Sequence, residues 1–421
     1  MPIKVVRADG CDGPLAGLGG GLRYCARQPI LDLRGRVQAY ELLFRNGNEG
    51  AFCGDGDLAT RTMLDNAVIF GVEQLTGGLP AFVNCTREAL VEELVQVLPP
   101  QMTVLEVLED LEPTPELVSA CRRLKAAGFR LALDDFVWRP GIEPLVELAD
   151  YIKVDFLETP AAERKALLRR VSGSTAALLA EKVETQEQYK QACAEGFRLI
   201  QGYFFCRPVL LQGEKIPANR LSQIRILEHL RNEPLDLHRV SELVKRDASL
   251  AYRLLRLINS PLCAVRQEVR SIEAALLAVG DDWFRRIATL AITSELNAGR
   301  PPELLRMAFV RARFCELAAE LCALNAAEQY LLGLLSLLSA MTHAPMEALT
   351  PALPLRAAAR RALEGADVAE RSLLEWVACH ERGDWMGCDA VARACGFDAE
   401  AAVACYARAV LWAEGVMCCA G

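Results

Sequence analysis

The chain has 421 residues, of which 52% are hydrophobic and 24% are charged, so it can bury more than one core. A net charge of −8 without a basic stripe argues against a nucleic-acid polymer as partner. The 16 cysteines are scattered without a CxxC pair, which is typical of a reducing cytoplasm. The start lacks an apolar signal-peptide core and the longest apolar stretches are too short for a bilayer, so we expect a cytoplasmic protein without membrane contact.

The sequence changes character along its length and predicts four segments. Residues 1–21 form a Gly-rich leader that we expect to be flexible. Residues 22–211 alternate strand-like and helix-like patterns, and 212–220 have the composition of a linker. From 221 to 421 the apolar residues recur at helical spacing throughout, which predicts an all-α domain after an α/β domain.

In chain order, the α/β half begins with a predicted hairpin, RYCARQPI and VQAYELLFR joined by the turn LDLRGR. Helical patterns then follow at 57–75, 86–97, 114–128, 160–171 and 185–196. Seven short apolar runs carry polar residues at or near their ends: AYELL, PAFVN, TVLEVLE, LALDD, YIKVD, AALLAEKVE and LIQGYFF. Such repeated units predict a parallel β/α barrel, whose reactive groups lie at the C-terminal ends of the strands.

Five of these strand-end residues carry oxygen donors, namely Glu41, Asn84, Glu106, Asp134 and Asp135. Hard cations such as Mg²⁺ or Mn²⁺ prefer such ligands, and crowded carboxylates repel one another unless a cation neutralises them. The first histidine is His229, so a zinc or non-haem iron site is not expected in this half. The pattern predicts a site for Mg²⁺ or Mn²⁺.

Lys153 and Glu181 add groups suited to phosphate chemistry. A lysine beside a metal can stabilise charge on phosphate or hold the attacking water, and a glutamate can accept its proton. Arg45 could bind a substrate phosphate or form a surface charge pair, and Gln201 could contact a nucleobase or satisfy the backbone. The residues therefore indicate a metal-assisted phosphodiesterase, or a relic of one.

The first half resembles the EAL-type cyclic di-GMP phosphodiesterase family over about residues 22–210. The motifs that carry the resemblance occur in the family's order: ELLFR, FVN, LEVLE, LDDF, IKVD, AEKVE and QGYFF. The resemblance implies a TIM-like barrel that linearises cyclic di-GMP with Mg²⁺ or Mn²⁺. The residues that it assigns are metal ligands Glu41, Asn84, Glu106, Asp134 and Asp135, catalytic Glu41, Lys153 and Glu181, substrate-binding Arg45, Gln201 and Asp155, and Glu109, which supports the loop after the fourth strand.

Two departures from the family pattern concern the signature and the loop. The signature reads ELL rather than EAL, and Val137 and Trp138 stand where active members have a Gly-rich loop over the metals. Valine disfavours the positive φ angles that glycine adopts, so we expect a different loop path. Because the family's loop also supports dimerisation, a homodimer is left open.

The second half resembles the HDOD domain, an HD-related output domain, through LLRLINSP, SIEAALLAVG, LLGLLSLLSA and ERGDW. None of the histidines His229, His238, His343 and His380 is followed by Asp, and Ser336–Leu337 stands where an HD enzyme would place that pair. We therefore expect a non-catalytic domain that binds an unidentified protein partner. The whole chain resembles the two-domain EAL–HDOD family of bacterial signalling proteins.

Three functions stay open from the sequence. The complete acidic set favours a cyclic di-GMP phosphodiesterase, whereas the altered loop favours a receptor that binds the nucleotide with weak or absent hydrolysis. A scaffold without ligand is the third alternative, and the complete acidic set argues against it.

Overall fold

The computed structural model describes residues 24–45, 72–206, 218–230, 235–260, 263, 265 and 269–420. The chain divides into two compact units. The barrel unit comprises Arg23–Arg207 together with Cys379–Gly387. The helical unit takes its described residues from Pro208–Ala378 and Cys388–Gly421.

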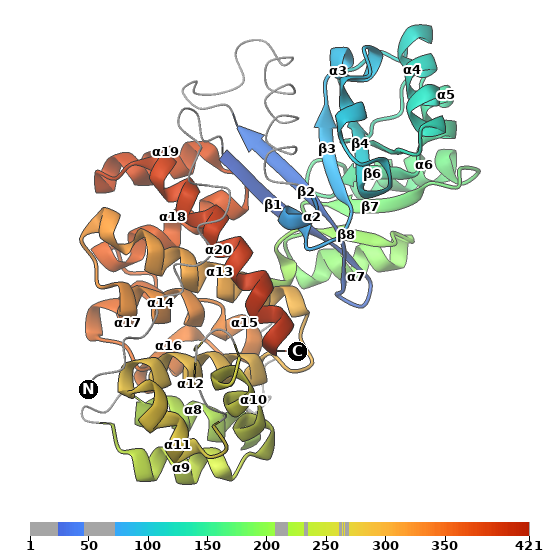
Figure 1. Ribbon diagram of the computed structural model, residues 1–421. Coiled ribbons are helices and arrows are strands. Elements are labelled where there is room, and N and C mark those ends of the chain that lie inside the picture. The colour runs from blue at the N-terminus through green and yellow to red at the C-terminus, as the bar shows by residue number, and fades with distance from the viewer. Residues whose placement is uncertain are drawn as a thin grey trace. The chain divides into compact units, whose positions relative to one another are not determined.

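The barrel unit is built on a closed barrel in which the strands follow one another in chain order (Figure 1). Its strands are β1 (Tyr24–Asp32), β2 (Val37–Arg45), β3 (Ala81–Cys85), β4 (Thr103–Val107), β5 (Arg130–Leu133), β6 (Tyr151–Asp155), β7 (Ala177–Glu181) and β8 (Leu199–Gln201). The predicted β/α barrel is confirmed, and each apolar run of the sequence contributes a strand to it.

β1 is antiparallel to its neighbours, as the predicted hairpin requires. β1 pairs antiparallel with both β2 and β8, whereas the pairs from β2 to β8 are parallel. The reason is the tight turn after Asp32, closed by a 2.9 Å hydrogen bond from Gly35 N to Asp32 O, because so short a connection joins only antiparallel strands. The predicted hairpin is thus confirmed, and the seven apolar runs predicted as parallel strands form β2 to β8, which are parallel to one another.

Short helices connect the strands. They are α2 (Val72–Thr76), α3 (Arg87–Val91), η3 (Leu94–Val97), η4 (Pro100–Met102), α4 (Pro115–Ala126), α5 (Glu143–Leu148), α6 (Ala161–Val171), α7 (Gln186–Glu195) and η5 (Phe204–Cys206). The single helix expected over 86–97 is divided into α3 and η3, because Glu93 adopts a left-handed φ of 58° between them. Most of the helix expected over 57–75, and the leader 1–21, lie outside the described residues.

Two apolar cores surround the strands. A small cluster, which includes Ile30, Phe82 and Leu179, contains residues of β1 to β5 and β7 and is distinct from a larger one. The larger cluster joins strand residues such as Val83 and Ile152 to helix residues of the same unit. Because side chains alternate along a strand, the inward-facing positions next to the strand ends are left for polar groups.

The helical unit contains helices and no strand within its described residues, as the sequence predicts. They are α8 (Ala218–Leu230), α9 (Leu237–Lys245), α10 (Ala248–Ile258), α11 (Ile272–Val279), α12 (Asp281–Leu296), α13 (Pro302–Ala318), η7 (Ala319–Cys322), α14 (Ala326–Leu335), α15 (Leu338–Thr342), α16 (Met346–Leu349), η8 (Thr350–Ala352), α17 (Ala357–Leu363), η9 (Ala369–Arg371), α18 (Ser372–Glu381), α19 (Trp385–Cys395) and α20 (Ala399–Ala420). α8 begins inside the segment expected as a linker, whose residues 212–217 lie outside the description.

Side-chain caps and one close approach define these helices. Asp236, Asp247 and Asn325 each accept a hydrogen bond from the backbone of the first turn that they precede. α13 and α14 approach so closely that a Cβ on Gly333 would lie 2.4 Å from Arg311 O.

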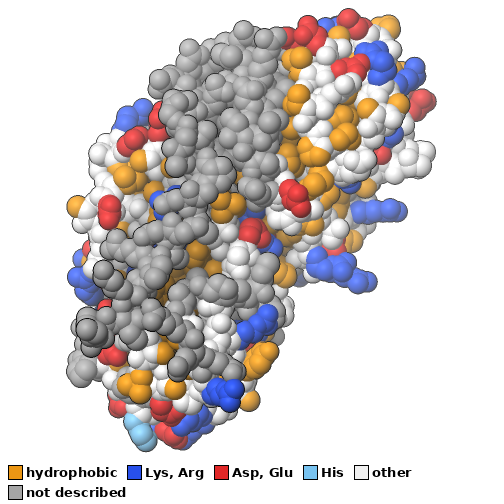
Figure 2. All heavy atoms as spheres, in the orientation of Figure 1, with side chains coloured by type: hydrophobic (Ala, Val, Ile, Leu, Met, Phe, Trp, Pro, Cys, Tyr) orange, Lys and Arg blue, Asp and Glu red, His pale blue; other side chains and the backbone are white. Residues whose placement is uncertain are grey.

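None of the helices in the described ranges is both long and apolar enough to cross a membrane. Figure 2 shows acidic and basic side chains interspersed on the described part of the face in view.

Candidate active site in the barrel mouth

The strand registers bring the predicted site residues together at one end of the barrel. Asn84 on β3 is the register partner of Glu106 on β4, and Asp155 on β6 is that of Glu181 on β7. Gln28 on β1 is paired with Glu41 on β2. The C-terminal ends of neighbouring strands therefore deliver these polar groups to one place.

Lys153 is the centre of the carboxylate cluster. Its side chain is 1% exposed, and its Nζ lies 2.7 Å from Asp134 Oδ1 and 2.9 Å from Glu181 Oε1. Glu41 Oε2 is 3.3 Å away, and Glu106 Oε1 also pairs with this ammonium group. One buried lysine thus neutralises part of the charge of four carboxylates.

The pKa values of the cluster follow from burial and mutual repulsion. Burial, reinforced by the charge of Glu41, raises the pKa of Glu106 well above its usual value. Burial also raises the pKa of Glu181 to about 8, although the charge of Lys153 opposes this shift. Burial lowers the pKa of Lys153, but the four surrounding carboxylates raise it well above its ordinary value. Near neutral pH the cluster therefore combines a charged lysine with carboxyl groups that retain protons.

Amide side chains hold Glu41 from two directions. Gln201 Nε2 donates to Glu41 Oε2 at 2.7 Å and to Gln28 Oε1 at 3.0 Å, while Asn84 Nδ2 donates to Glu41 Oε1 at 3.4 Å. Gln28 has no role in the sequence analysis. Its register position opposite Glu41 in the predicted hairpin was the signal that could have identified it.

Several buried oxygens of the cluster lack a hydrogen-bond partner. They are Asn84 Oδ1, Glu106 Oε2, Asp135 Oδ1, Glu181 Oε2 and Gln201 Oε1. Buried acceptors of this kind are costly unless a donor or a cation satisfies them. Four of the five belong to carboxylates or to Asn84, so the donor chemistry fits a hard divalent cation.

The carboxylates of the cluster nevertheless surround the ammonium group of Lys153. No three Asp, Glu, His or Cys side chains in the described parts of the chain are placed to hold one metal ion. Because four carboxylates point to Lys153 Nζ instead, a metal ion would need some of these side chains to rotate away from the ammonium group.

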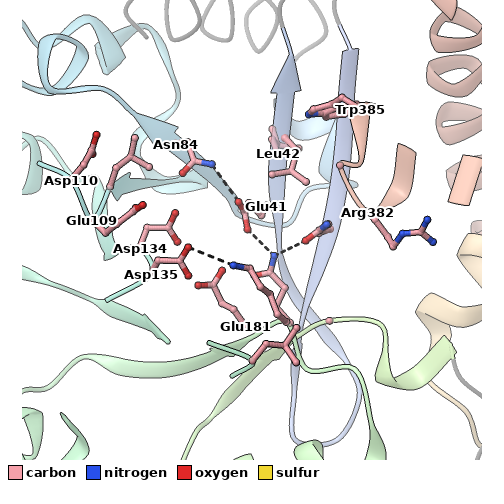
Figure 3. A pocket seen from close by; sticks show the side chains of 18 of the residues that line it. Glu41, Leu42, Asn84, Glu109, Asp110, Asp134, Asp135, Glu181, Arg382 and Trp385 are labelled. Carbon is pink, nitrogen blue, oxygen red and sulfur yellow. Dashed lines mark hydrogen bonds and ion pairs between the residues drawn. The ribbon is translucent and has the colours of Figure 1, made fainter. Parts of the chain in front are cut away.

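A cavity of about 790 Å³ opens above the cluster. Figure 3 shows Glu41, Asn84, Asp134, Asp135 and Glu181 around it, and Gln201 also lines it. This size lies within the range typical of small-molecule sites. Arg382 and Trp385, from the Cys379–Gly387 segment of the barrel unit, line the cavity too, whereas the sequence analysis assigned ERGDW to the helical half.

Asp155 has a different environment from the one expected of a substrate ligand. Its Oδ1 accepts hydrogen bonds from Leu157 N at 2.6 Å and Glu158 N at 2.8 Å, and its Oδ2 pairs with Lys182. These contacts hold the turn after β6, so contact of Asp155 with substrate stays a prediction. The side chain of Arg45, at the end of β2, lies outside the described residues, and its predicted role is untested.

The altered loop after Asp135 is fastened by an arginine. Arg139 Nη1 donates to Glu109 O at 2.6 Å, and Nη2 donates to Leu111 O. Positive φ angles occur at Asp135 (36°) and Gly141 (85°), and Val137 is not among the residues with this geometry. Glu109 contacts the loop through its backbone carbonyl, which is compatible with the predicted support of this loop.

Comparisons with known proteins identify the families of the two domains. The EAL domain family matches residues 80–208, and the HDOD domain family matches 216–380. YuxH of Bacillus subtilis is 35% identical over 94% of this chain and 98% of its own length. Cyclic di-GMP phosphodiesterase CdgJ of Vibrio cholerae is 32% identical over 90% of this chain and 89% of its length. BlrP1 of Klebsiella pneumoniae, solved with calcium and cyclic di-GMP, is 24% identical, with a TM-score of 0.38 over 44% of this chain and 55% of BlrP1.

Proposed function

We propose that this chain, which belongs to the family of proteins that join an EAL domain to an HDOD domain, is a cyclic di-GMP signalling protein. Its barrel binds cyclic di-GMP with a divalent cation and hydrolyses it weakly to the linear dinucleotide. The observation that carries the proposal is the set of buried oxygen donors without partners beside a cavity of about 790 Å³. The similarity to the cyclic di-GMP phosphodiesterase CdgJ of Vibrio cholerae supports the choice of nucleotide.

The residues that would hold Mg²⁺ or Mn²⁺ are Glu41, Asn84, Glu106, Asp134 and Asp135. When bound, the cation stabilises negative charge on a phosphate and lowers the pKa of water. Release of the carboxylates from Lys153 is the step that the protein itself must supply, because they pair with its ammonium group in the described arrangement.

In this proposal Glu181 transfers the proton, and Lys153 stabilises the negative charge that develops. Glu181 acts in its deprotonated form, and its pKa of about 8 gives it the strength of a general base: it accepts a proton from the attacking water as the water oxygen bonds to phosphorus. The P–O3′ bond breaks, and the leaving oxygen takes a proton from solvent. The Lys153 ammonium group stabilises the charge that develops on the phosphate oxygens.

Two features account for weak turnover. Lys153 must exchange partners before the carboxylates can bind metal, and the loop with Val137 and Trp138 replaces the Gly-rich one of active relatives. In the extreme case the barrel is a receptor without turnover. The pairing of Lys153 with four carboxylates favours that alternative, because a cation would have to compete with the ammonium group for them.

The helical unit is the non-catalytic output part in this proposal. Ser336 and Leu337 stand where an HD enzyme would carry its metal-binding pair. Its protein partner, and a homodimer, stay predictions.

The test is incubation of the full-length protein with cyclic di-GMP and Mn²⁺, with chromatography of the products and calorimetry of binding on the same sample. We expect slow formation of the linear dinucleotide, abolished in Glu41→Ala and Asp134→Ala. Glu400→Ala, a change of an exposed residue on α20 of the helical unit, is the matched control and should leave turnover unchanged. Turnover that survives both site variants would disprove the assignment, and binding without product would establish a receptor.

A further inference from the structure

A second ammonium group lies beside the site. Lys182 directly follows Glu181 at the end of β7, and its Nζ pairs with Asp155 Oδ2 and lies 3.6 Å from Asp135 Oδ2. Figure 3 marks the contact to Asp135. The lysine lines the same cavity as Asp135 and Glu181. The cluster therefore contains two protein cations, Lys153 in its interior and Lys182 at the Asp135 side.

The backbone around Lys182 determines where its side chain points. Lys182 has a left-handed φ of 52°, a conformation that is unfavourable for a non-glycine residue. Hydrogen bonds on either side maintain it: Phe156 N donates to Glu181 O at 3.1 Å, and Val183 N donates to Gln201 O at 3.0 Å. The main chain from which the Lys182 side chain starts is thus fixed by the barrel.

Asp155 forms an ion pair with the Lys182 ammonium group. Its carboxylate is fixed by the backbone amides of Leu157 and Glu158, and it lies almost fully buried, at 4% exposure. An anchored carboxylate keeps the ammonium group near Asp135, although the Lys182 side chain is 48% exposed. The position of this charge is therefore set without the help of any ligand.

Asp135 is the donor that Lys182 affects most. One of its oxygens, Oδ1, is buried without a hydrogen-bond partner, and the other faces the ammonium group. Glu181, 6% exposed and lining the cavity, has a buried Oε2 that also lacks a partner. These open acceptors indicate a cation site, and any divalent cation at Asp135 would experience repulsion from Lys182.

We propose that Lys182 is a built-in cation of this site: its ammonium group, anchored by Asp155, neutralises Asp135 and weakens the binding of a divalent cation there. The inference rests on the metal site of the proposed function. Turnover in this chain is then weak for two reasons: the altered loop over the metals, and the low affinity for the metal that Lys182 causes.

The test is calorimetric titration of the full-length protein with Mn²⁺ near neutral pH, without nucleotide. Lys182→Met removes the charge and keeps most of the side-chain stem, so we expect Mn²⁺ to bind about tenfold more tightly than to the unaltered protein. Lys182→Arg keeps the charge and should retain the original affinity. Lys190→Met removes an exposed lysine on α7 and is the matched control without effect.

Lys182→Gly is a second variant, which removes the charge and also relieves the left-handed backbone. It should bind Mn²⁺ as tightly as Lys182→Met, and it keeps the test valid if the methionine variant fails to fold. Equal Mn²⁺ affinity of the unaltered protein and both neutral variants would overturn this inference and leave the metal site intact. Absence of Mn²⁺ binding in every protein would overturn the metal site and this inference together.

Discussion

At the residue scale, the barrel mouth shows how one lysine makes a cluster of carboxylates tolerable. Glu106 is fully buried and Glu181 nearly so, and both pair with Lys153. Separation of such a group from water costs several kcal/mol unless an opposite charge compensates it. From the sequence we expected Lys153 beside a metal ion, and the structure shows that its ammonium group is also a direct counter-ion of four carboxylates.

The raised pKa of Glu181 has a consequence for stability. In an unfolded chain this carboxyl group titrates near pH 4.3, whereas its pKa in the folded protein is about 8. Between about pH 4.5 and about pH 8 the folded state binds more protons than the unfolded state does. The contribution of Glu181 to the free energy of unfolding is therefore fully present below this window and is lost as pH rises through it.

Replacement of Glu181 with Gln tests this linkage in the metal-free protein. Because Gln does not titrate, we expect Glu181→Gln to gain stability relative to the unaltered protein as pH rises from about 5 to about 8. Urea unfolding in the presence of a chelator, at about pH 5, 7 and 9, measures the difference. Parallel stability curves for the two proteins would contradict a raised pKa of Glu181.

At the scale of elements, the strand ends and the loops after them decide the geometry of the site. Glu106 lies on β4 and Asp134 follows β5, and a 3.0 Å hydrogen bond from Asp134 N to Val107 O extends their pairing beyond the strands. Phe136 N then donates to Lys153 O at 2.9 Å, and the Phe136 side chain is buried in the core. The DDF motif is thus fixed on both sides before the loop diverges at Val137.

Arg139 is the residue that we expect to compensate for the missing glycines of this loop. Arg139→Ala loses hydrogen bonds to Glu109 O and Leu111 O and should lower the free energy of unfolding by about 1–2 kcal/mol. Because the loop follows Asp135, Mn²⁺ and cyclic di-GMP should also bind more weakly. Urea unfolding and calorimetry measure the two effects.

Thr185→Ala is a suitable control for that experiment. Thr185 caps α7 by accepting a hydrogen bond from Gln188 N, so its loss should cost about 1 kcal/mol of stability without weakening ligand binding. If Arg139→Ala destabilises the protein but binds both ligands as before, Arg139 supports the fold only and not the site.

At the scale of the whole molecule, one chain contains a barrel unit with a candidate site and a separate helical unit. We expect Mn²⁺ with cyclic di-GMP to raise the melting temperature of the full-length protein. Ligand at about 100 times its Kd adds about 2.7 kcal/mol to the stability of the state that binds it. Differential scanning calorimetry measures this shift, which should be absent in Asp134→Ala; an equal shift in that variant would place the binding site elsewhere.

The local patterns of the sequence determined much of the architecture. Apolar runs of strand length with polar ends predicted the strands of the barrel, and the turn LDLRGR predicted the β1–β2 hairpin, because short connections and side-chain alternation are local properties. Helical periodicity likewise predicted the second half. The strand-end position of residues such as Glu41 and Asp134 predicted that they would lie at one mouth of the barrel.

Only the tertiary structure decided the contacts within that mouth. Lys153 and Glu41 are 112 residues apart, and no local pattern states that their charged groups meet at 3.3 Å. The same holds for Gln28 beside Gln201, and for the inclusion of Cys379–Gly387 in the barrel unit. The position of Lys182 between Asp135 and Asp155, and the pKa of Glu181, depend on burial and on charges that folding brings together, because electrostatic interaction follows distance in space and not separation along the chain.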